Sequence, residues 1–391
     1  MYSIIFLLIS IFLLLIILFK LFNSNKNYFM CFLITLFIFL FVSNLKSCMD
    51  AALVGVNLVV KTIVPTIFPF SVICNLLISY DGIGLYSKIL GPIICKPLKL
   101  SKSASFPIVA SVLSGYPLGC KYCCDLYSLG YIDRKEFERL LNIASNASPM
   151  FLIGSIGAAM LGNIKLGFIL LISNYLSPII IGILTLKKAS TYCNEKPLIS
   201  YNKTANFGIA LKNALEKGIN TTLQIGAFVV IFSIIISIIK NNAYISIIFN
   251  NIETFFNIPK YSLYGLFVGS VEFTNGCKLI TTLPLSLPFK LGIISFICSF
   301  SGLSVIAQIS SFISEYNVSI AKYTFWKFIQ GIISFIITFI ISNILSITSP
   351  VSTLPNNNTF SFSIYLAIYL ILLIPILFPL IISCIKKLHS F

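Results

Sequence analysis

The chain has 391 residues, of which 58% are hydrophobic and only 10% charged, and its mean hydropathy is +0.99. No soluble domain can bury so much apolar surface, so this composition excludes a soluble globular protein and points to the lipid bilayer as its surroundings. A formal charge of +16 would suggest nucleic acid in a soluble chain, but lysines in cytoplasmic loops and anionic lipid headgroups account for it here, and no nucleic acid partner is expected.

Long apolar runs predict the membrane spans. Four runs are each long enough to cross the ~30 Å hydrocarbon core as a helix, and they cover residues 1–22, 28–45, 164–186 and 360–385. Because the runs are continuous, they favour an all-α polytopic membrane protein with about 8–10 membrane segments over a β-barrel. The first run has no preceding basic residue and no small-x-small cleavage site after it, so we interpret it as a retained span.

A polar, lysine-bearing connector divides the chain into two similar units. A Gly-x-Asn triplet, a Phe-Ser pair, a Gly-Cys-Lys segment and a small-polar segment follow one another in both units. They occupy 55–57, 70–71, 119–121 and 146–149 in the first unit, and 218–220, 232–233, 276–278 and 301–304 in the second. The predicted organisation is N-terminal spans over 1–48, a first repeat over 49–186, the connector over 187–206, a second repeat over 207–349 and a C-terminal span over 350–391.

Lysines gather at two places between the spans, 88–102 and 187–217. Cytoplasmic loops of membrane proteins carry an excess of Lys and Arg, so we place both stretches on the cytoplasmic side.

Two further elements are expected in the first unit. Residues 105–119 are too short and too broken for a full span, and we interpret them as one arm of a re-entrant hairpin with a Gly-Tyr-Pro tip. Asp133 can cap a following helix, with Glu136 completing a capping box and Arg134 paired to Glu138 one turn on. An apolar stripe on one face of that helix predicts a water-facing surface helix that ties two membrane segments together.

The first polar segment, Ser114–Lys121, is expected to be unwound. Pro117 lacks an amide donor and disfavours helix at Tyr116, while Gly115 and Gly119 allow unusual dihedral angles. A helix beginning near Gly119 would aim its positive end and Lys121 at an anion. Tyr116 could stack on an aromatic solute or merely occupy an interface.

The second polar segment, Glu272–Lys278, follows deeply apolar sequence, where an unpaired carboxylate is costly. Glu272 must therefore pair with Lys278 or Lys121, bind a cation, or hold a proton. A fixed ion pair that locks the two halves together is the alternative. Ser114, Thr274 and Asn275 can bind a solute or simply bridge helices.

The cysteines and the missing motifs indicate what the chain does not use. Cys120, Cys123 and Cys124 form a C-x-x-C-C group, but a zinc site needs four ligands and the single histidine is His389. We expect reduced, buried thiols with no metal and no cofactor. The sequence has none of the hydrolase, metalloprotease or P-loop motifs, so we expect no enzyme, and any transport would be driven by a gradient of protons or another ion.

At these positions the chain resembles the sporulation integral membrane protein YlbJ family, which is built from two nucleoside-recognition ("Gate") domains. The family's Ser-Gly-Tyr-Pro-x-Gly-x-Lys turn matches Ser114–Lys121, and its Asn-x-Ser-Pro segment matches 146–149. Its Glu-x-Thr-x-Gly signature matches Glu272–Gly276, and a Gly-Gly-Leu-Ser segment matches Ser301–Ser304. Two departures are Ser301 in place of a glycine and Ile306 where a polar or histidine residue is expected.

The resemblance implies a carrier of endospore formation in the outer forespore membrane, which moves dipicolinic acid from the mother cell towards the forespore. Lys121 and Lys278 would each meet a carboxylate of this planar dicarboxylate, and Tyr116 would lie against its ring. Homo-oligomers or other spore membrane proteins are further expected partners. A scaffold for spore-envelope assembly and a nucleoside carrier remain open. The candidate substrate-binding residues are Ser114, Gly115, Tyr116, Pro117, Gly119, Lys121, Asn146, Ser148, Glu272, Thr274, Asn275, Gly276, Lys278, Ser301 and Gly302.

Overall fold

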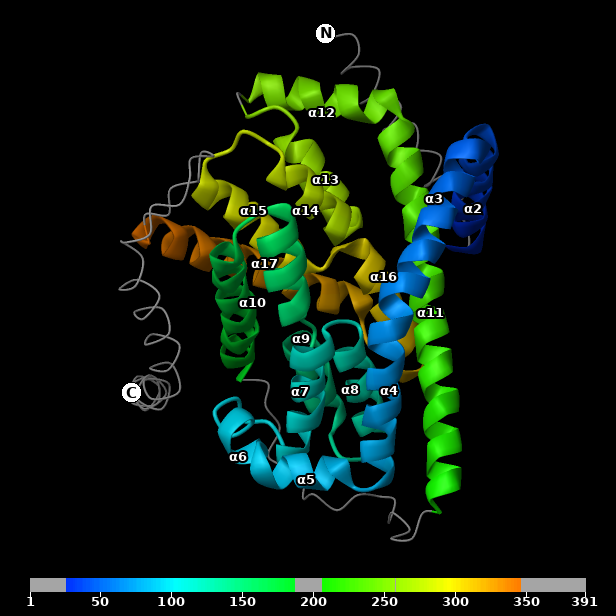
Figure 1. Ribbon diagram of the computed structural model, residues 1–391, viewed down its shortest axis with the longest axis vertical. Coiled ribbons are helices and arrows are strands. Elements are labelled where there is room, and N and C mark those ends of the chain that lie inside the picture. Colours follow the sequence, from blue (N-terminus) through cyan, green and yellow to red (C-terminus); the bar gives the residue numbers. More distant parts are fainter. Residues whose placement is uncertain (1–25, 187–205, 257, 346–391) are drawn as a thin grey trace.

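A computed structural model describes residues 26–186, 206–256 and 258–345, and within these ranges the secondary structure is all-helical (Figure 1). The predicted spans over 1–22 and 360–385 and most of the connector lie outside the described residues. Among the residues that the structure describes, five helices are long and apolar enough to cross a membrane, which confirms the predicted all-α polytopic membrane class. They are Leu45–Ser79, Ile164–Leu184, Phe207–Asn241, Leu287–Tyr316 and Ile320–Ile344.

The first half begins with α2 (Lys26–Ser43), close to the predicted 28–45 span. A long helix follows, in which α3 (Leu45–Leu58) and α4 (Val64–Ser79) are joined by a π-helical turn over 59–63. The shorter elements are α5 (Gly82–Ile89), α6 (Gly91–Ile94), α7 (Ser105–Ser114), α8 (Leu118–Ser128) and α9 (Arg134–Ile143), and the half ends with the π-helical η3 (Met150–Met160) and α10 (Ile164–Leu184).

The second half begins with a single long helix, α11 (Phe207–Asn241). Its shorter elements are α12 (Ala243–Phe255), α13 (Ser262–Val271), α14 (Phe273–Thr281), α15 (Leu287–Phe300) and α16 (Gly302–Ile313), and it ends with α17 (Ile320–Ile344).

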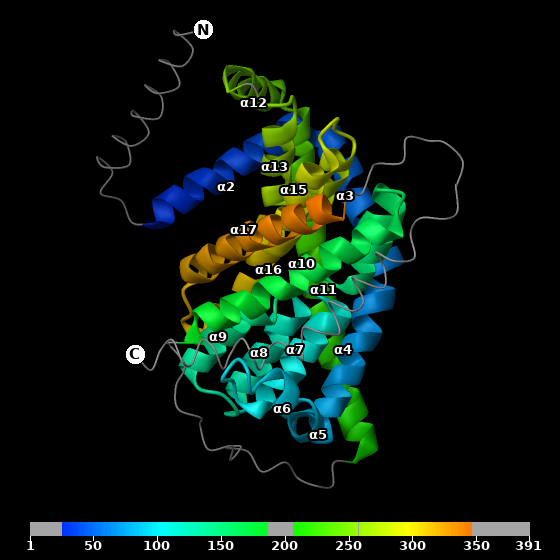
Figure 2. The ribbon, with the colours of Figure 1, turned by 90° about the vertical axis from the view of Figure 1, so that its left-hand side faces the viewer.

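The order of elements is the same in the two halves. Each has a long helix, a short helix, a helical hairpin, a broken helix and a further long helix. In the first half these are, in order, α3–α4, α5, α7/α8, α9/η3 and α10. In the second half they are α11, α12, α13/α14, α15/α16 and α17. Figures 1 and 2 show α5 and α12 at opposite ends of the molecule, with α4 and α11 running antiparallel beside each other. This is the arrangement of an inverted repeat, and it agrees with the predicted internal duplication.

The long helices differ in what surrounds them. In the most apolar stretch of Leu45–Ser79 only 6% of the residues are buried, whereas in that of Leu287–Tyr316 83% are buried. Apolar side chains on the outside of a membrane protein face lipid tails or other apolar partners. The α3–α4 helix therefore lies at the periphery and α15/α16 at the centre.

A helical hairpin is present where the sequence predicted a re-entrant one at 105–119. Helix α7 ends at Ser114, the chain turns through Gly115 and Tyr116, and α8 begins at Leu118. Gly115 has a φ of +82°, and a Cβ on it would meet the amide nitrogen of Ser148 at 2.9 Å. Both the backbone conformation and the close neighbour require glycine at this turn.

Helix α9 corrects one prediction. Asp133 caps it by accepting a hydrogen bond from the Glu136 amide at 2.7 Å, and Arg134 pairs with Glu138 at 3.6 Å, both as expected. The helix is nevertheless largely buried and not a water-facing surface helix. Instead of completing a capping box, Glu136 accepts a hydrogen bond from the Ser101 amide, and Arg139 donates to the carbonyls of three residues. Burial raises the pKa of the Glu136 carboxyl and lowers the pKa of the Arg139 guanidinium.

Candidate functional site

The first hairpin tip contacts the first broken helix directly. The amide of Tyr116 donates to the carbonyl of Asn146 at 2.8 Å. Gly115 lies against the backbone of Ser148, where α9 has ended and η3 has not begun. The structure thus brings together four of the residues predicted for the site, and all four lie on segments that are not helical.

The two hairpin tips also meet. The ring of Tyr116 lies edge-on against that of Phe273, with centroids 5.2 Å apart, and Phe273 in turn contacts Phe151 at 5.0 Å. Phe273 is the first residue of α14, so an aromatic contact joins the tip of α7/α8 to the tip of α13/α14. An internal repeat places its binding site where the two units face each other, and these contacts are at such a place.

Glycines allow the second tip to pack closely on the second broken helix. A Cβ on Gly276 would overlap the Cα of Gly269, so α13 and α14 are in backbone contact. Ser301 and Gly302, at the break between α15 and α16, have φ values of +71° and +73°. A Cβ on Gly302 would come within 3.4 Å of backbone atoms of the second tip, which explains why glycine stands there.

Glu272 pairs with neither Lys121 nor Lys278, the two lysines that the sequence analysis offered as partners. It is the N-cap of α14, and its carboxylate accepts hydrogen bonds from the amides of Thr274 at 3.0 Å and Asn275 at 2.8 Å. The side-chain amide of Asn275 donates to the same carboxylate at 2.7 Å. The charge is compensated by helix-terminal amides instead of by a lysine, because an N-cap partner is available two residues away.

A lysine that the sequence analysis did not single out approaches the second tip. Lys240, near the end of α11, donates to the Asn275 side-chain carbonyl oxygen at 2.7 Å. Lys278, which we predicted at the site, lies in the last turn of α14 and is exposed. Asn275 accepts from Lys240 and also donates to Glu272, so a lysine of α11 and the carboxylate of the second tip share one amide side chain.

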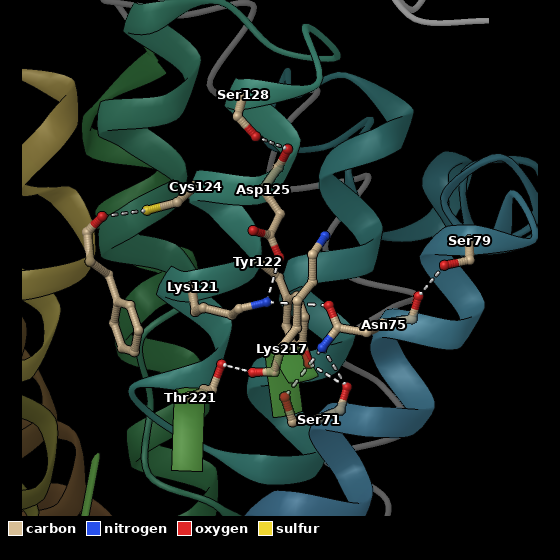
Figure 3. Close-up of polar contacts among 11 residues, drawn as sticks. Ser71, Asn75, Ser79, Lys121, Tyr122, Cys124, Asp125, Ser128, Lys217 and Thr221 are labelled. Carbon is tan, nitrogen blue, oxygen red and sulfur yellow. Dashed lines mark hydrogen bonds and ion pairs between the residues drawn. The ribbon is translucent and has the colours of Figure 1, made fainter. Parts of the chain in front are cut away.

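Lys121 belongs to a separate polar network on the face of α8 towards α4 (Figure 3). Its ammonium pairs with Asp125 at 2.7 Å and donates to the Asn75 side-chain carbonyl oxygen at 3.4 Å. Asn75 in turn donates to the Ser71 carbonyl at 2.8 Å. The first hairpin is therefore connected through Lys121 to the long peripheral helix, and the lysine is charge-paired within its own helix.

The least exposed lysine of the described residues is one that the sequence analysis missed. Lys327 of α17 is 0% exposed, and its ammonium donates to the Ser145 carbonyl at 2.6 Å and to Gln330 at 2.8 Å. Gln330 then donates to the Asn146 side chain at 3.0 Å. A basic residue inside an apolar span, with an amide side chain three residues later, was the available signal.

Further buried polar groups continue from this lysine along the helix interfaces. Asn174 of α10 donates to Ser295 at 3.2 Å and accepts from Ser299 at 2.8 Å, and Ser295 contacts Ser334 at 2.6 Å. Such bonds between helices stabilise a membrane bundle without involving a ligand.

The remaining predicted side chains have local partners. The Ser114 hydroxyl donates to the Ala110 carbonyl at 2.6 Å, and the Ser148 hydroxyl accepts from the Phe151 amide at 3.3 Å. The thiols of Cys120, Cys123 and Cys124 are buried and free. Two of them face backbone carbonyls, Cys120 that of Leu141 at 3.5 Å and Cys124 that of Phe312 at 3.6 Å.

Several hydroxyls close to the tips lack a partner among the described residues. The Tyr116 hydroxyl is buried without a hydrogen bond, and so are those of Ser111 and Ser304. Ser111 lies under the start of α8, and Ser304 is in the first turn of α16. Buried polar atoms normally have partners, so unpaired ones at both broken regions leave capacity for a polar ligand.

Known proteins resemble this chain to different degrees. No protein-family model matches it. The sporulation integral membrane protein YlbJ of Bacillus subtilis is 25% identical over 312 residues, which are 74% of this chain and 76% of that protein. A solved structure of a doubly substituted CNTnw in an outward-facing state has a TM-score of 0.44 and 16% identity, and it covers 72% of this chain and 76% of that one. The chain is thus an integral membrane protein and a homologue of YlbJ, as the Ser114–Lys121 and Glu272–Gly276 motifs indicated.

Proposed function

We propose that the protein is a secondary carrier that moves a small anionic aromatic solute, dipicolinic acid or a similar dicarboxylate, across a spore-forming cell's membrane. The observation that supports this most directly is the meeting of the two hairpin tips at Tyr116 and Phe273, beside the two broken helices. Non-helical backbone at membrane depth is tolerated where it is buried in protein or lines a cavity, and in transporters it holds the substrate.

The groups around the tips suit a planar anion. The partly exposed rings of Tyr116 and Phe273 can stack on an aromatic solute, and the positive end of α8, which has no side-chain cap, favours a carboxylate. Lys121 follows the first tip by four residues along the chain, and Lys240 contacts Asn275 at the second tip. Both lysines are candidate partners for the carboxylates of the solute. Lys240 replaces Lys278 in this proposal, because Lys240 donates to the Asn275 side chain at the second tip, whereas Lys278 lies in the last turn of α14.

The repeat suggests how the solute would cross. Two inverted units with a site between them support alternating access, in which one part of the bundle moves against the other around a fixed site. The α3–α4 helix and α11 pack on each other along their lengths (Figure 2). We propose them as the static part, and the hairpins with the central helices as the moving part. Coupling to a proton or another ion gradient and placement in the outer forespore membrane are parts of the same proposal.

The deciding experiment is uptake of labelled dipicolinate into liposomes that hold the purified protein, under imposed proton or sodium gradients. Saturable uptake is expected, and it should fall strongly in Tyr116→Ala and Lys240→Met. Lys260→Met, on the loop before α13, is the matched control for Lys240→Met. Saturable uptake in none of the gradients, by a protein that remains folded, would contradict the proposal.

The same uptake assay distinguishes the proposed function from two alternative functions. A nucleoside carrier would show uptake that nucleosides inhibit and dipicolinate does not. A membrane scaffold would show no solute flux, and its tip variants would lower protein abundance or assembly instead. An enzymatic role has no acid–base pair to support it at the tips.

A further inference from the structure

A cavity lies apart from the hairpin tips, where α9 meets the end of α10 and the beginning of α17. Its volume is about 450 Å³. The lining residues are Lys135, Glu138, Arg139, Leu141 and Asn142 of α9, Thr185, and Val318, Ser319, Lys322, Tyr323 and Trp326. Thr185 follows the last residue of α10, and Ile320 is the first residue of α17. Both helices are apolar enough to cross a membrane. The cavity is therefore at the end of two spans, where a membrane meets water.

The lining is positively charged. Lys135, Arg139 and Lys322 face one carboxylate, Glu138. Lys322 contacts Glu138, which leaves two of its three N–H donors unused. Lys135 is exposed and has no ion-pair partner within the ranges that the structure describes. The lining itself thus carries three cations and one carboxylate.

Arg139 adds charge and rigidity to this lining. Its guanidinium donates to the carbonyls of Leu98 at 2.9 Å and Gly182 at 3.2 Å, which are neutral acceptors, while the carboxylates of Glu136 and Asp133 attract its charge from outside the lining. The first turn of α17, capped by Ser319, adds the positive end of a long helix. Both features favour an anion in the cavity.

The remaining lining residues indicate an amphipathic ligand. Trp326, Tyr323 and Leu141 supply aromatic and apolar surface beside the lysines. Tryptophan is enriched at the boundary between membrane and water, where its ring lies at the depth of lipid headgroups. The buried Asn142 also lines the cavity, and its side-chain carbonyl oxygen has no donor among the described residues, so a ligand hydroxyl would satisfy it.

The lysines that follow α10 in the sequence indicate on which side of the membrane this end of the two spans lies. Lys187 and Lys188 follow Thr185 closely in the sequence, at the start of the lysine-bearing connector. The positive-inside rule assigns such a segment to the cytoplasm, whose leaflet is the anionic one. Basic pockets between membrane helices on that side bind the headgroups of anionic lipids.

From this combination we infer that the α9–α10–α17 cavity is a binding site for a phosphate-bearing anion, presented by the headgroup of an anionic phospholipid such as phosphatidylglycerol. The lysines bind the phosphate, Trp326 lies against the glycerol backbone, and the lipid tails run along the apolar outer surface of α17. The site is independent of the solute carried at the hairpin tips.

The test uses Trp326 itself. It is the single tryptophan of the chain, so its fluorescence reports on this cavity alone. The full-length protein is placed in nanodiscs of phosphatidylcholine with increasing fractions of phosphatidylglycerol, and the emission is recorded. A saturable change is expected with phosphatidylglycerol, and none with phosphatidylcholine alone.

Variants tie the response to the lysines. Lys135→Gln removes an exposed, unpaired cation and is expected to fold normally, while raising the half-saturating fraction of phosphatidylglycerol roughly fivefold. Lys322→Gln should act in the same direction. Lys212→Gln on α11, an exposed lysine outside the cavity, is the matched control and should leave the titration unchanged.

A second arm identifies the source of the anion. Inorganic phosphate is titrated into the protein in pure phosphatidylcholine nanodiscs. If phosphate gives no saturation while phosphatidylglycerol does, the headgroup is the ligand. If phosphate alone saturates and Lys135→Gln weakens it, the site takes a free phosphate-type anion. No saturation with either, or an equal loss in Lys212→Gln, overturns the proposal.

Discussion

Lys327 of α17 donates a hydrogen bond to the backbone carbonyl of Ser145, 182 residues earlier in the chain, at 2.6 Å. Ser145 lies between the end of α9 and the beginning of η3, next to Asn146, whose carbonyl holds the first hairpin tip. The helices α10, α15 and α16 that pack on α17 contain no Asp or Glu. The nearby acidic residues Glu136, Glu138 and Asp125 are engaged with Ser101, Lys322 and Lys121. Among the described residues, this buried lysine thus has no carboxylate partner, and it connects the last long helix to the proposed site.

Lys327→Met is expected to reduce dipicolinate uptake by on the order of tenfold to a hundredfold, because the segment that positions the first tip loses its support. The substitution also removes a buried charge, so the free energy of unfolding should change by no more than about 2 kcal/mol. Liposome uptake and thermal unfolding of the same preparation check both. Lys290→Met, which removes a lysine that donates to the Thr281 carbonyl at 3.1 Å on the neighbouring α15, is the control. Unchanged uptake in Lys327→Met would remove this lysine from the mechanism.

The ion pair of Lys121 and Asp125 allows the scaffold and carrier hypotheses to be separated. The exchange variant K121D/D125K keeps an ion pair on α8 but moves the positive charge one turn further from the tip. A carrier that uses Lys121 for an anionic solute should lose uptake in this variant and keep its abundance in the membrane. If the pair is only a structural tether, uptake in the exchange variant should match wild type, while Lys121→Met alone should lower abundance.

Much of the backbone geometry around the first hairpin tip could be predicted, because its sequence signals are local. Gly115 and Pro117 in apolar sequence predicted the hairpin tip, and Asp133 three residues before Glu136 predicted a helix start. Both predictions depend on residues within one turn of each other. The close approach of the first tip to Asn146 and Ser148 also agrees with the segments that the sequence singled out.

The predictions that failed, and the residues that were missed, depend mostly on contacts between different helices. Glu136 was expected to bond within its own helix, but it bonds with the Ser101 amide 35 residues earlier, and α9 is buried by its packing on α8, α10 and α17. Glu272 was expected to pair with Lys278 or Lys121, to bind a cation or to hold a proton, and the N-terminus of its own following helix supplied its hydrogen-bond partners. Lys327 and Lys240 were missed because their partners come from other elements, and a single sequence does not reveal which helices pack together.

Glu272 can be tested both as a cap and as a coupling group. Glu272→Ala removes the carboxylate that holds the amides of Thr274 and Asn275, so it should lower the free energy of unfolding by about 0.5–2 kcal/mol. Glu272→Gln keeps one acceptor and should lose less. If Glu272 carries the coupled proton, Glu272→Gln should also abolish the stimulation of uptake by a proton gradient. Asp133→Ala, which removes the cap of α9, is the control for stability and should retain that stimulation.

Glu253 of α12 provides a purely structural prediction. It is 1% exposed, and its carboxylate accepts hydrogen bonds from the amides of Tyr261 at 2.6 Å, Leu263 at 2.7 Å and Tyr264 at 3.1 Å. These amides are at the beginning of α13, so the short helix of the second unit fixes the start of the second hairpin. Each hydrogen bond to a charged group contributes about 1.5–3 kcal/mol, and Glu253→Ala leaves all of them unmade.

We therefore expect Glu253→Ala to destabilise the protein by at least about 3 kcal/mol, a larger loss than that expected for Glu272→Ala. Thermal unfolding in detergent measures it. Glu216→Ala on α11 is the matched control, because Glu216 is exposed and its contact with Lys212 is 3.9 Å. Exposed pairs of that kind contribute about 0–1 kcal/mol. Equal stability of the two variants would show that the α12 carboxylate does not hold the second hairpin, and the tip at Phe273 would then need another anchor.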